Sequence, residues 1–284
     1  MHIYGIDLKP WYRWLPLVVA FFLFYHHAVD TLISDWNTDP NFSHGFLIPF
    51  ISIYMVWYKK NELRLMEPRP SSWGLLFIFA GMGTHFIGTI GAELFLLRFS
   101  IIFTLAGILI YGFGFNIFKV LWLPVVYLIL MIPIPAIIWN KIAFPLQLMA
   151  AKLASHIIML ITIPVYREGN ILHLANTSLE VVDACSGLRS LTSLIALSTI
   201  FAYLAPISSL KKWILFFSAI PIAVTVNVIR LSITAGMAYW ISPETAHGFL
   251  HDMSGLIIFG LALFLIYVVF LGLLRWEKRQ AKDG

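Results

Sequence analysis

One cysteine, one arginine and a pair of histidines are the residues of this chain whose types and spacing could perform covalent chemistry. Cys185, in "VVDACSGLRS", is the only cysteine among 284 residues. Arg230, in "NVIRL", lies inside a long apolar run, where a charged side chain is costly unless its surroundings are polar. His247 and His251, in "AHGFLHDMSG", have the spacing that places two side chains on one face of a helix.

Together these groups match the needs of thiol chemistry at an acyl carbon. Such chemistry uses a thiolate, a histidine that exchanges protons near neutral pH, and a hydrogen-bond donor for the oxyanion. Ser186 and Gly187 are expected to open a helix directly after Cys185, and the partial positive charge of that helix end favours a thiolate. The residues also allow an inert packed cysteine, an arginine that extends to the membrane interface, or histidines that bind a metal.

Composition restricts the class of protein. Hydrophobic residues make up 60% of the chain and charged residues 12%, with a mean hydropathy of +0.86, which is too apolar for a soluble domain. A single cysteine excludes an intramolecular disulfide. The net charge of +5 is typical of basic cytoplasmic loops, so we expect a polytopic membrane protein without a nucleic-acid partner.

Apolar runs near the roughly 20 residues that a transmembrane helix needs predict about eight spans. They are Trp11–Val29, Phe42–Tyr58, Trp73–Gly91, Phe99–Phe118, Val120–Ile138, Leu188–Ala205, Trp213–Trp240 and Met253–Leu274. A further run, Ile142–Ile163, carries Lys152, Ser155 and His156 on one helical face, which is typical of a helix in the membrane interface. The first run is expected to be retained as a membrane anchor, since no small-residue cleavage site follows it.

The distribution of Lys and Arg predicts the orientation in the membrane. With eight spans and a cytoplasmic N-terminus, most basic residues fall in cytoplasmic segments, whereas a ninth span would move Lys211 and Lys212 outside. Both termini are then cytoplasmic. Cys185 and the loop Ile241–Asp252 lie on the outer, periplasmic face.

The only sizeable segment outside the expected spans, residues 139–186, leads to Cys185 on that outer face. Within it, apolar and polar residues alternate over Ile171–Leu174 and again over Leu179–Val182. This alternation predicts a short β-hairpin that positions the cysteine.

Three blocks, "VVDACSGLRSL", "NVIRL" and "HDMSGLIIF", follow one another on successive expected spans and resemble the signature blocks of the exosortase/archaeosortase family. "DPNFSHGFLIPFISIYMVW" resembles the family's block at its second span, and "REGNILHL" resembles the stretch before its cysteine. The resemblance covers about Asp39 to Phe259, within a single integral-membrane domain expected over residues 1–284. A histidine at the third signature position resembles the bacterial exosortase branch.

The resemblance implies a membrane-embedded cysteine transpeptidase or protease of the bacterial inner membrane. Its substrates would be exported proteins that carry a C-terminal sorting signal, a transmembrane helix and a basic tail. Cleavage would pass through a thioester, followed by transfer to an acceptor. The implied roles are nucleophile for Cys185, oxyanion stabilisation for Arg230 and general acid and base for His251.

Several polar residues near these positions are candidates for supporting roles. They are Asn227, Arg189, Asp183, His44 and His247. Asn227 lies one turn before Arg230 on the same face, Arg189 could compete for the oxyanion, and His44 could face the same cavity or the outer interface. We expect no metal and no cofactor; membrane lipid is the other expected partner.

A non-enzymatic alternative is a small transporter or channel that uses Arg230 and the outer histidines as an intramembrane binding site. Three features weigh against it. The sequence has no internal repeat, the expected spans lack acidic residues, and the polar candidates lie at one face of the membrane.

Overall fold

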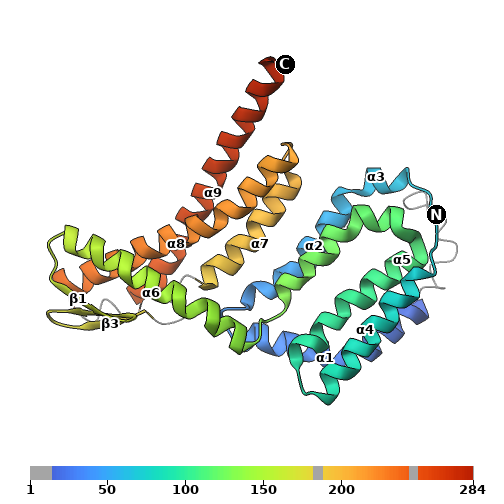
Figure 1. The fold of residues 1–284 in the computed structure, drawn as a ribbon, viewed down its shortest axis with the longest axis horizontal. Coiled ribbons are helices and arrows are strands. Elements are labelled where there is room, and N and C mark those ends of the chain that lie inside the picture. Colours follow the sequence, from blue (N-terminus) through green and yellow to red (C-terminus); the bar gives the residue numbers. More distant parts are fainter. Residues whose placement is uncertain (1–14, 182–187, 243–248, 284) are drawn as a thin grey trace. The chain divides into compact units, whose positions relative to one another are not determined.

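The computed structural model describes residues 15–181, 188–242 and 249–283, and they form helices with one small sheet (Figure 1). The helices are α1 (Leu15–Thr38), η2 (Ser43–Phe46), α2 (Leu47–Tyr58), α3 (Lys60–Arg64), α4 (Trp73–Ile90), α5 (Leu94–Tyr127), η3 (Leu128–Met131), α6 (Ala136–Leu160), α7 (Leu188–Leu204), α8 (Ser209–Trp240) and α9 (Phe249–Asp283). The predicted all-α polytopic fold is confirmed.

Within the described residues, six helices are long and apolar enough to cross a membrane. They span Leu15–Thr38, Trp73–Ile90, Leu94–Met131, Ala136–Leu160, Ser209–Trp240 and Gly255–Gln280. Two of the expected spans, Phe99–Phe118 and Val120–Ile138, fall largely in α5 and η3, which are continuous apart from a break. Helix α6 also has the length and composition of a spanning helix, so its interfacial location stays a prediction.

The chain divides into two compact units, Met1–Pro135 and Ala136–Gly284, which are described separately. The expectation of a single domain stays a prediction. In the first unit, α4 packs closely along α5 because glycines form its contact face. A Cβ atom at Gly88 would lie 2.6 Å from the backbone nitrogen of Leu97, and one at Gly81 would collide with the Thr104 hydroxyl.

Helix α5 is broken at Gly114, where the backbone adopts φ 85° and ψ 173°. The cause is the linker before α4, which lies against this point: a Cβ at Gly114 would collide with the carbonyl oxygen of Arg69. The linker also forms hydrogen bonds with carbonyl groups of α5. The Arg69 N–H donates to the Phe113 carbonyl at 3.1 Å, and the Ser71 N–H donates to the Ile110 carbonyl at 3.3 Å. Only glycine adopts such a positive φ without strain.

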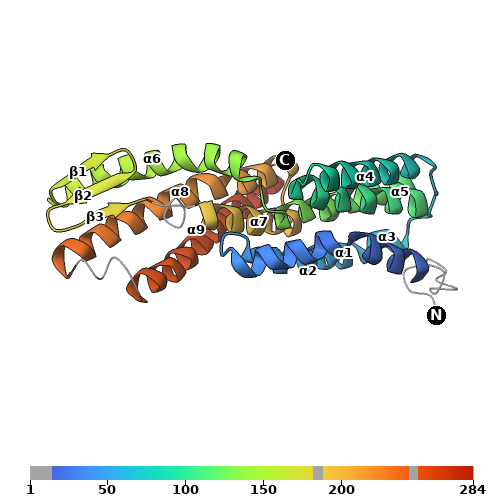
Figure 2. The ribbon, with the colours of Figure 1, turned by 90° about the horizontal axis from the view of Figure 1, so that it is seen from below.

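In the second unit, a small sheet covers part of α6 and α8 (Figure 2). Its strands are β1 (Val165–Glu168), β2 (Ile171–Leu174) and β3 (Ser178–Glu180), antiparallel in that order. Leu172 and Leu179 are opposite each other in the register and buried. The predicted hairpin is therefore present, and β1 adds a third strand that the sequence interpretation missed.

Candidate active site

Helix α8 runs antiparallel to both α7 and α9, so the start of α7 and the start of α9 lie beside the second half of α8 (Figure 1). Two contacts fix their alignment. The Ser198 hydroxyl is 3.5 Å from the Phe216 carbonyl, and the Lys211 Nζ is 2.7 Å from the Glu277 carboxylate. Ten residues before Ser198 in α7 is Leu188, and ten residues after Phe216 in α8 is Val226. Because the two helices are antiparallel, Leu188 and Val226 are level with each other.

Arg230, in the second half of α8, lies against α9 near the start of that helix. A Cβ atom at Gly255 would be 3.9 Å from Nη2 and 4.0 Å from Cζ of Arg230, so the guanidinium packs on the backbone of α9. His251 precedes Gly255 by one helical turn in the same helix, and residues four apart share a helix face. The structure therefore places the backbone positions of two predicted catalytic residues on adjoining parts of α8 and α9.

Asn227 lies one turn before Arg230 in α8 and is buried, with 3% of its surface exposed. Arg230 itself is half-buried. Buried polar side chains on an otherwise apolar spanning helix are costly. Their concentration on this part of α8 marks it as a polar site within the apolar helix.

The sheet is held against α8 beside this site. Val181 is fully buried in a cluster with Val228 and Leu231 of α8, and its N–H donates to the Asn170 carbonyl at 2.9 Å. The Asn176 side chain donates to the Ala238 carbonyl at 3.2 Å. The last described residue before the cysteine segment is thus fixed against the same helix that carries Arg230.

The other predicted site residues are described only in part. Cys185, Asp183 and His247 lie outside the described residues. Arg189 and His251 belong to the first turns of α7 and α9, but their side chains also lie outside the description. Their roles stay predictions.

His44 lies in the first unit, in the turn η2 that precedes α2. Its turn is built by Asp39, whose carboxylate accepts from the Asn41 N–H at 2.8 Å and whose carbonyl accepts from the Phe42 N–H at 3.0 Å. Gly45 is required because a Cβ there would collide with the Trp36 indole. Burial lowers the pKa of His44, against hydrogen bonds with backbone groups of Leu130 and Asn41 that raise it.

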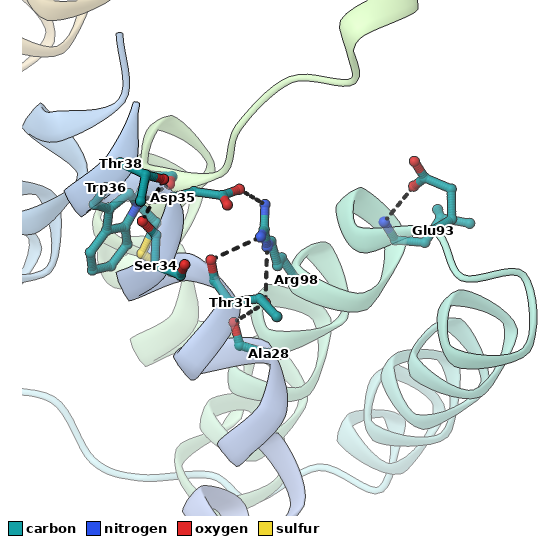
Figure 3. A network of polar contacts seen from close by, with 10 residues as sticks. Ala28, Thr31, Ser34, Asp35, Trp36, Thr38, Glu93 and Arg98 are labelled. Atoms are coloured by element: carbon teal, nitrogen blue, oxygen red, sulfur yellow. Dashed lines mark hydrogen bonds and ion pairs between the residues drawn. The ribbon is translucent and has the colours of Figure 1, made fainter. Parts of the chain in front are cut away.

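An ion pair made by a buried arginine of the first unit was missed by the sequence interpretation (Figure 3). Arg98 of α5 is 2% exposed, and its Nη1 lies 2.7 Å from the Asp35 carboxylate of α1. Its Nη2 also donates to the Thr31 carbonyl at 3.0 Å. Helix α1 continues beyond the expected span Trp11–Val29 to Thr38 and therefore includes Asp35.

Lys211, which the sequence interpretation placed in a cytoplasmic segment between spans, lies within helix α8. It is buried at the start of α8, where its Nζ donates to Glu277 at 2.7 Å and to Gln280 at 2.5 Å, and it lies 4.7 Å from the centre of the Trp276 ring. This lysine joins α8 to the last turns of α9. Among the described residues, no group of three His, Cys, Asp or Glu side chains could hold a metal ion.

The fold and the site define an integral-membrane protein with a polar site on the second half of α8. The family model described as transmembrane exosortase matches residues 36–268, which is most of the chain. This chain belongs to the transmembrane exosortase family, and is therefore a membrane protein involved in the processing of sorting signals. No significant match was found among curated proteins or among solved structures.

Proposed function

We propose that this exosortase is a cysteine transpeptidase or protease that cleaves the C-terminal sorting signal of exported membrane-tethered proteins. The observation that carries the proposal is the position of the Arg230 guanidinium, which lies 3.9 Å from a Cβ built at Gly255, one turn from His251. Cys185 belongs to the segment between Val181 and Leu188. Both ends of that segment are anchored near the same part of α8.

Chain length limits how far Cys185 can be from this site. Four residues separate it from Val181, and an extended chain covers at most roughly 3.6 Å per residue, which gives about 14 Å. Val181 is buried with Val228 and Leu231, the residues that flank the Arg230 region. Three residues further on, Leu188 begins α7 at the level of Val226. These limits on both sides of the segment support a thiol within reach of the guanidinium.

In the proposed mechanism, the thiolate of Cys185 attacks a peptide carbonyl carbon of the sorting signal. The carbonyl electrons move to oxygen, and Arg230 donates hydrogen bonds to that oxyanion. The intermediate collapses with loss of the amine, which receives a proton from His251, and a thioester remains. An amine or hydroxyl acceptor then attacks the thioester and gives its proton to His251, while water as acceptor would give hydrolysis.

Charge supports a cytoplasmic location for one end of the first unit. The basic residues Lys59, Lys60, Arg64, Arg69 and Lys119 gather at the end where α2 finishes, α4 begins and α5 is broken. Asp35 and Asp39 lie at the opposite end of this unit, where α1 finishes. This asymmetry follows the positive-inside tendency and supports both the inner-membrane orientation and a periplasmic active site.

The orientation has its own test in reporter fusions. A reporter inserted near Asn176 should be exported, and one placed after Leu210 should be cytoplasmic. A cytoplasmic reporter at Asn176 would mean that α6 spans the membrane and would contradict a periplasmic cysteine.

The function itself is tested by paired substitutions at adjacent residues. Cys185→Ala should abolish cleavage of a tail-bearing exported protein in membranes, because the thiol forms the covalent bond. Ser186→Ala changes the neighbouring residue by a similar volume and should retain cleavage. Processing by Cys185→Ala at the wild-type rate, with both variants at equal levels in the membrane, would refute the proposal.

A further inference from the structure

We propose that the hollow between the linker before α4 and the second part of α5 binds the headgroup of an anionic phospholipid. The hollow has a volume of about 480 Å³. It is lined by Met66, Glu67, Arg69, Asn116, Lys119 and Val120. This inference does not depend on the proposed peptidase chemistry, since the hollow lies in the first unit.

Its walls are held in place by backbone interactions. The break of α5 at Gly114 fits against the Arg69 carbonyl, and the Arg69 N–H donates to the Phe113 carbonyl at 3.1 Å. The linker and α5 are therefore fixed to each other on both sides of the break. A volume of about 480 Å³ is within the usual range for small-molecule sites.

The polar groups of the hollow favour an anion. Arg69 and Lys119 supply two cations, Asn116 supplies an amide donor, and Glu67 is the one carboxylate of the lining. Within residues 15–181, 188–242 and 249–283, neither cation has a side-chain hydrogen bond or ion pair. Guanidinium and ammonium groups are the usual protein ligands of phosphate.

The level of the hollow indicates a membrane source for this anion. The Ser52 hydroxyl donates to the Pro124 carbonyl at 2.8 Å. The turn η2, which precedes α2, contacts η3, which follows α5, so α2 is antiparallel to this part of α5. Trp57 is therefore level with Lys119. Trp57 and Trp122 are about half exposed, and exposed tryptophans collect at the membrane interface.

Apolar residues at the rim fit the same source. Leu65 is 89% exposed directly before the linker, a position that suits contact with lipid. Met66 and Val120 give the hollow an apolar part beside its cations. A phosphodiester with attached acyl chains satisfies both parts, whereas free phosphate satisfies only the first. Basic pockets between helices at the cytoplasmic surface are a known type of lipid-headgroup site.

The test is lipid binding by the purified full-length protein, with phosphatidylglycerol added to phosphatidylcholine nanodiscs and retained lipid measured by native mass spectrometry. Arg69→Gln combined with Lys119→Gln should weaken phosphatidylglycerol binding about thirtyfold, because both cations of the hollow act on the same headgroup and each contributes roughly fivefold. The matched control, Lys278→Gln with Arg279→Gln, removes the same charge from exposed residues of α9 and should bind as wild type.

A second variant keeps the test independent of these two residues. Asn116→Asp adds a carboxylate to the lining and should also weaken phosphatidylglycerol binding. Unchanged binding in the double variant, or equal weakening in the α9 control, would overturn the proposal. Inorganic phosphate that displaces the lipid at equal concentration would show that a soluble anion is the ligand and would overturn the lipid source.

Discussion

Replacement of Gly255 by leucine should disable the active site while leaving each of its proposed chemical groups in the chain. A Cβ at this position lies 3.9 Å from Nη2 of Arg230, which is ordinary contact, so alanine fits. The branched end of leucine extends further and would occupy the place of the guanidinium, which must then move by on the order of 1 Å or more. Misplacement by about 1 Å can cost roughly 100-fold in rate.

The expected loss for Gly255→Leu is therefore about 100-fold or more, comparable to removal of one oxyanion donor, which costs roughly 10² to 10³ in kcat. Gly255→Ala should stay near the wild-type rate. The assay is the single-turnover cleavage of a tail-bearing substrate in membranes that contain equal amounts of each variant.

Gly260 provides a matched control in the same helix. No atom lies within 4 Å of a Cβ built there, so Gly260→Leu makes the same chemical change without reaching Arg230 and should remain active. Full activity of Gly255→Leu, or equal losses in the Gly255 and Gly260 variants, would refute the role assigned to the contact between Arg230 and α9.

Three further predictions concern stability and catalysis. Asp35→Asn should destabilise the protein by about 3 kcal/mol because it leaves the buried Arg98 charge without its counterion. Arg98→Met leaves only the 36% exposed Asp35 and should cost less, and a larger loss of unfolding free energy in bicelles for Arg98→Met than for Asp35→Asn would contradict this. Burial lowers the pKa of His44, so its contribution to stability is present above pH 6.5 and is lost as pH falls through the lowered pKa. His44→Gln should flatten the loss of thermal stability as pH falls below 6.5, and an unchanged pH profile would contradict this. Arg230→Lys should lose cleavage although the charge is kept, because an ammonium lacks the planar set of donors; wild-type rates would exclude a guanidinium-specific role.

The polar site could be anticipated from the sequence because a charge inside an apolar run is informative by itself. Arg230 stands out in this way, and Asn227 follows from helical spacing. The contact between Arg230 and Gly255 is different, since it depends on how α8 and α9 are aligned. That alignment is fixed by contacts such as the one between Lys211 and Glu277, which no local pattern encodes.

The same distinction explains the misses in the first unit. Arg98 stands just before an expected span, and only the pairing of α1 with α5 shows that it is buried and paired with Asp35. The break at Gly114 likewise depends on a linker more than forty residues earlier in the chain. Strand β1 was missed because Val165–Glu168 has no strict alternation, and its structure comes from pairing with β2.

The most direct test of the central claim is the isolation of the covalent intermediate at Cys185. The full-length protein, incubated in membranes with a tail-bearing substrate and quenched in acid, should yield a peptide that contains Cys185 and carries the substrate as a thioester, detected by mass spectrometry. Hydroxylamine should release the substrate, and His251→Ala should slow formation of the adduct, since it removes the proposed proton donor. Substrate cleavage that proceeds at the normal rate in Cys185→Ala, without any such adduct in the wild type, would contradict the account.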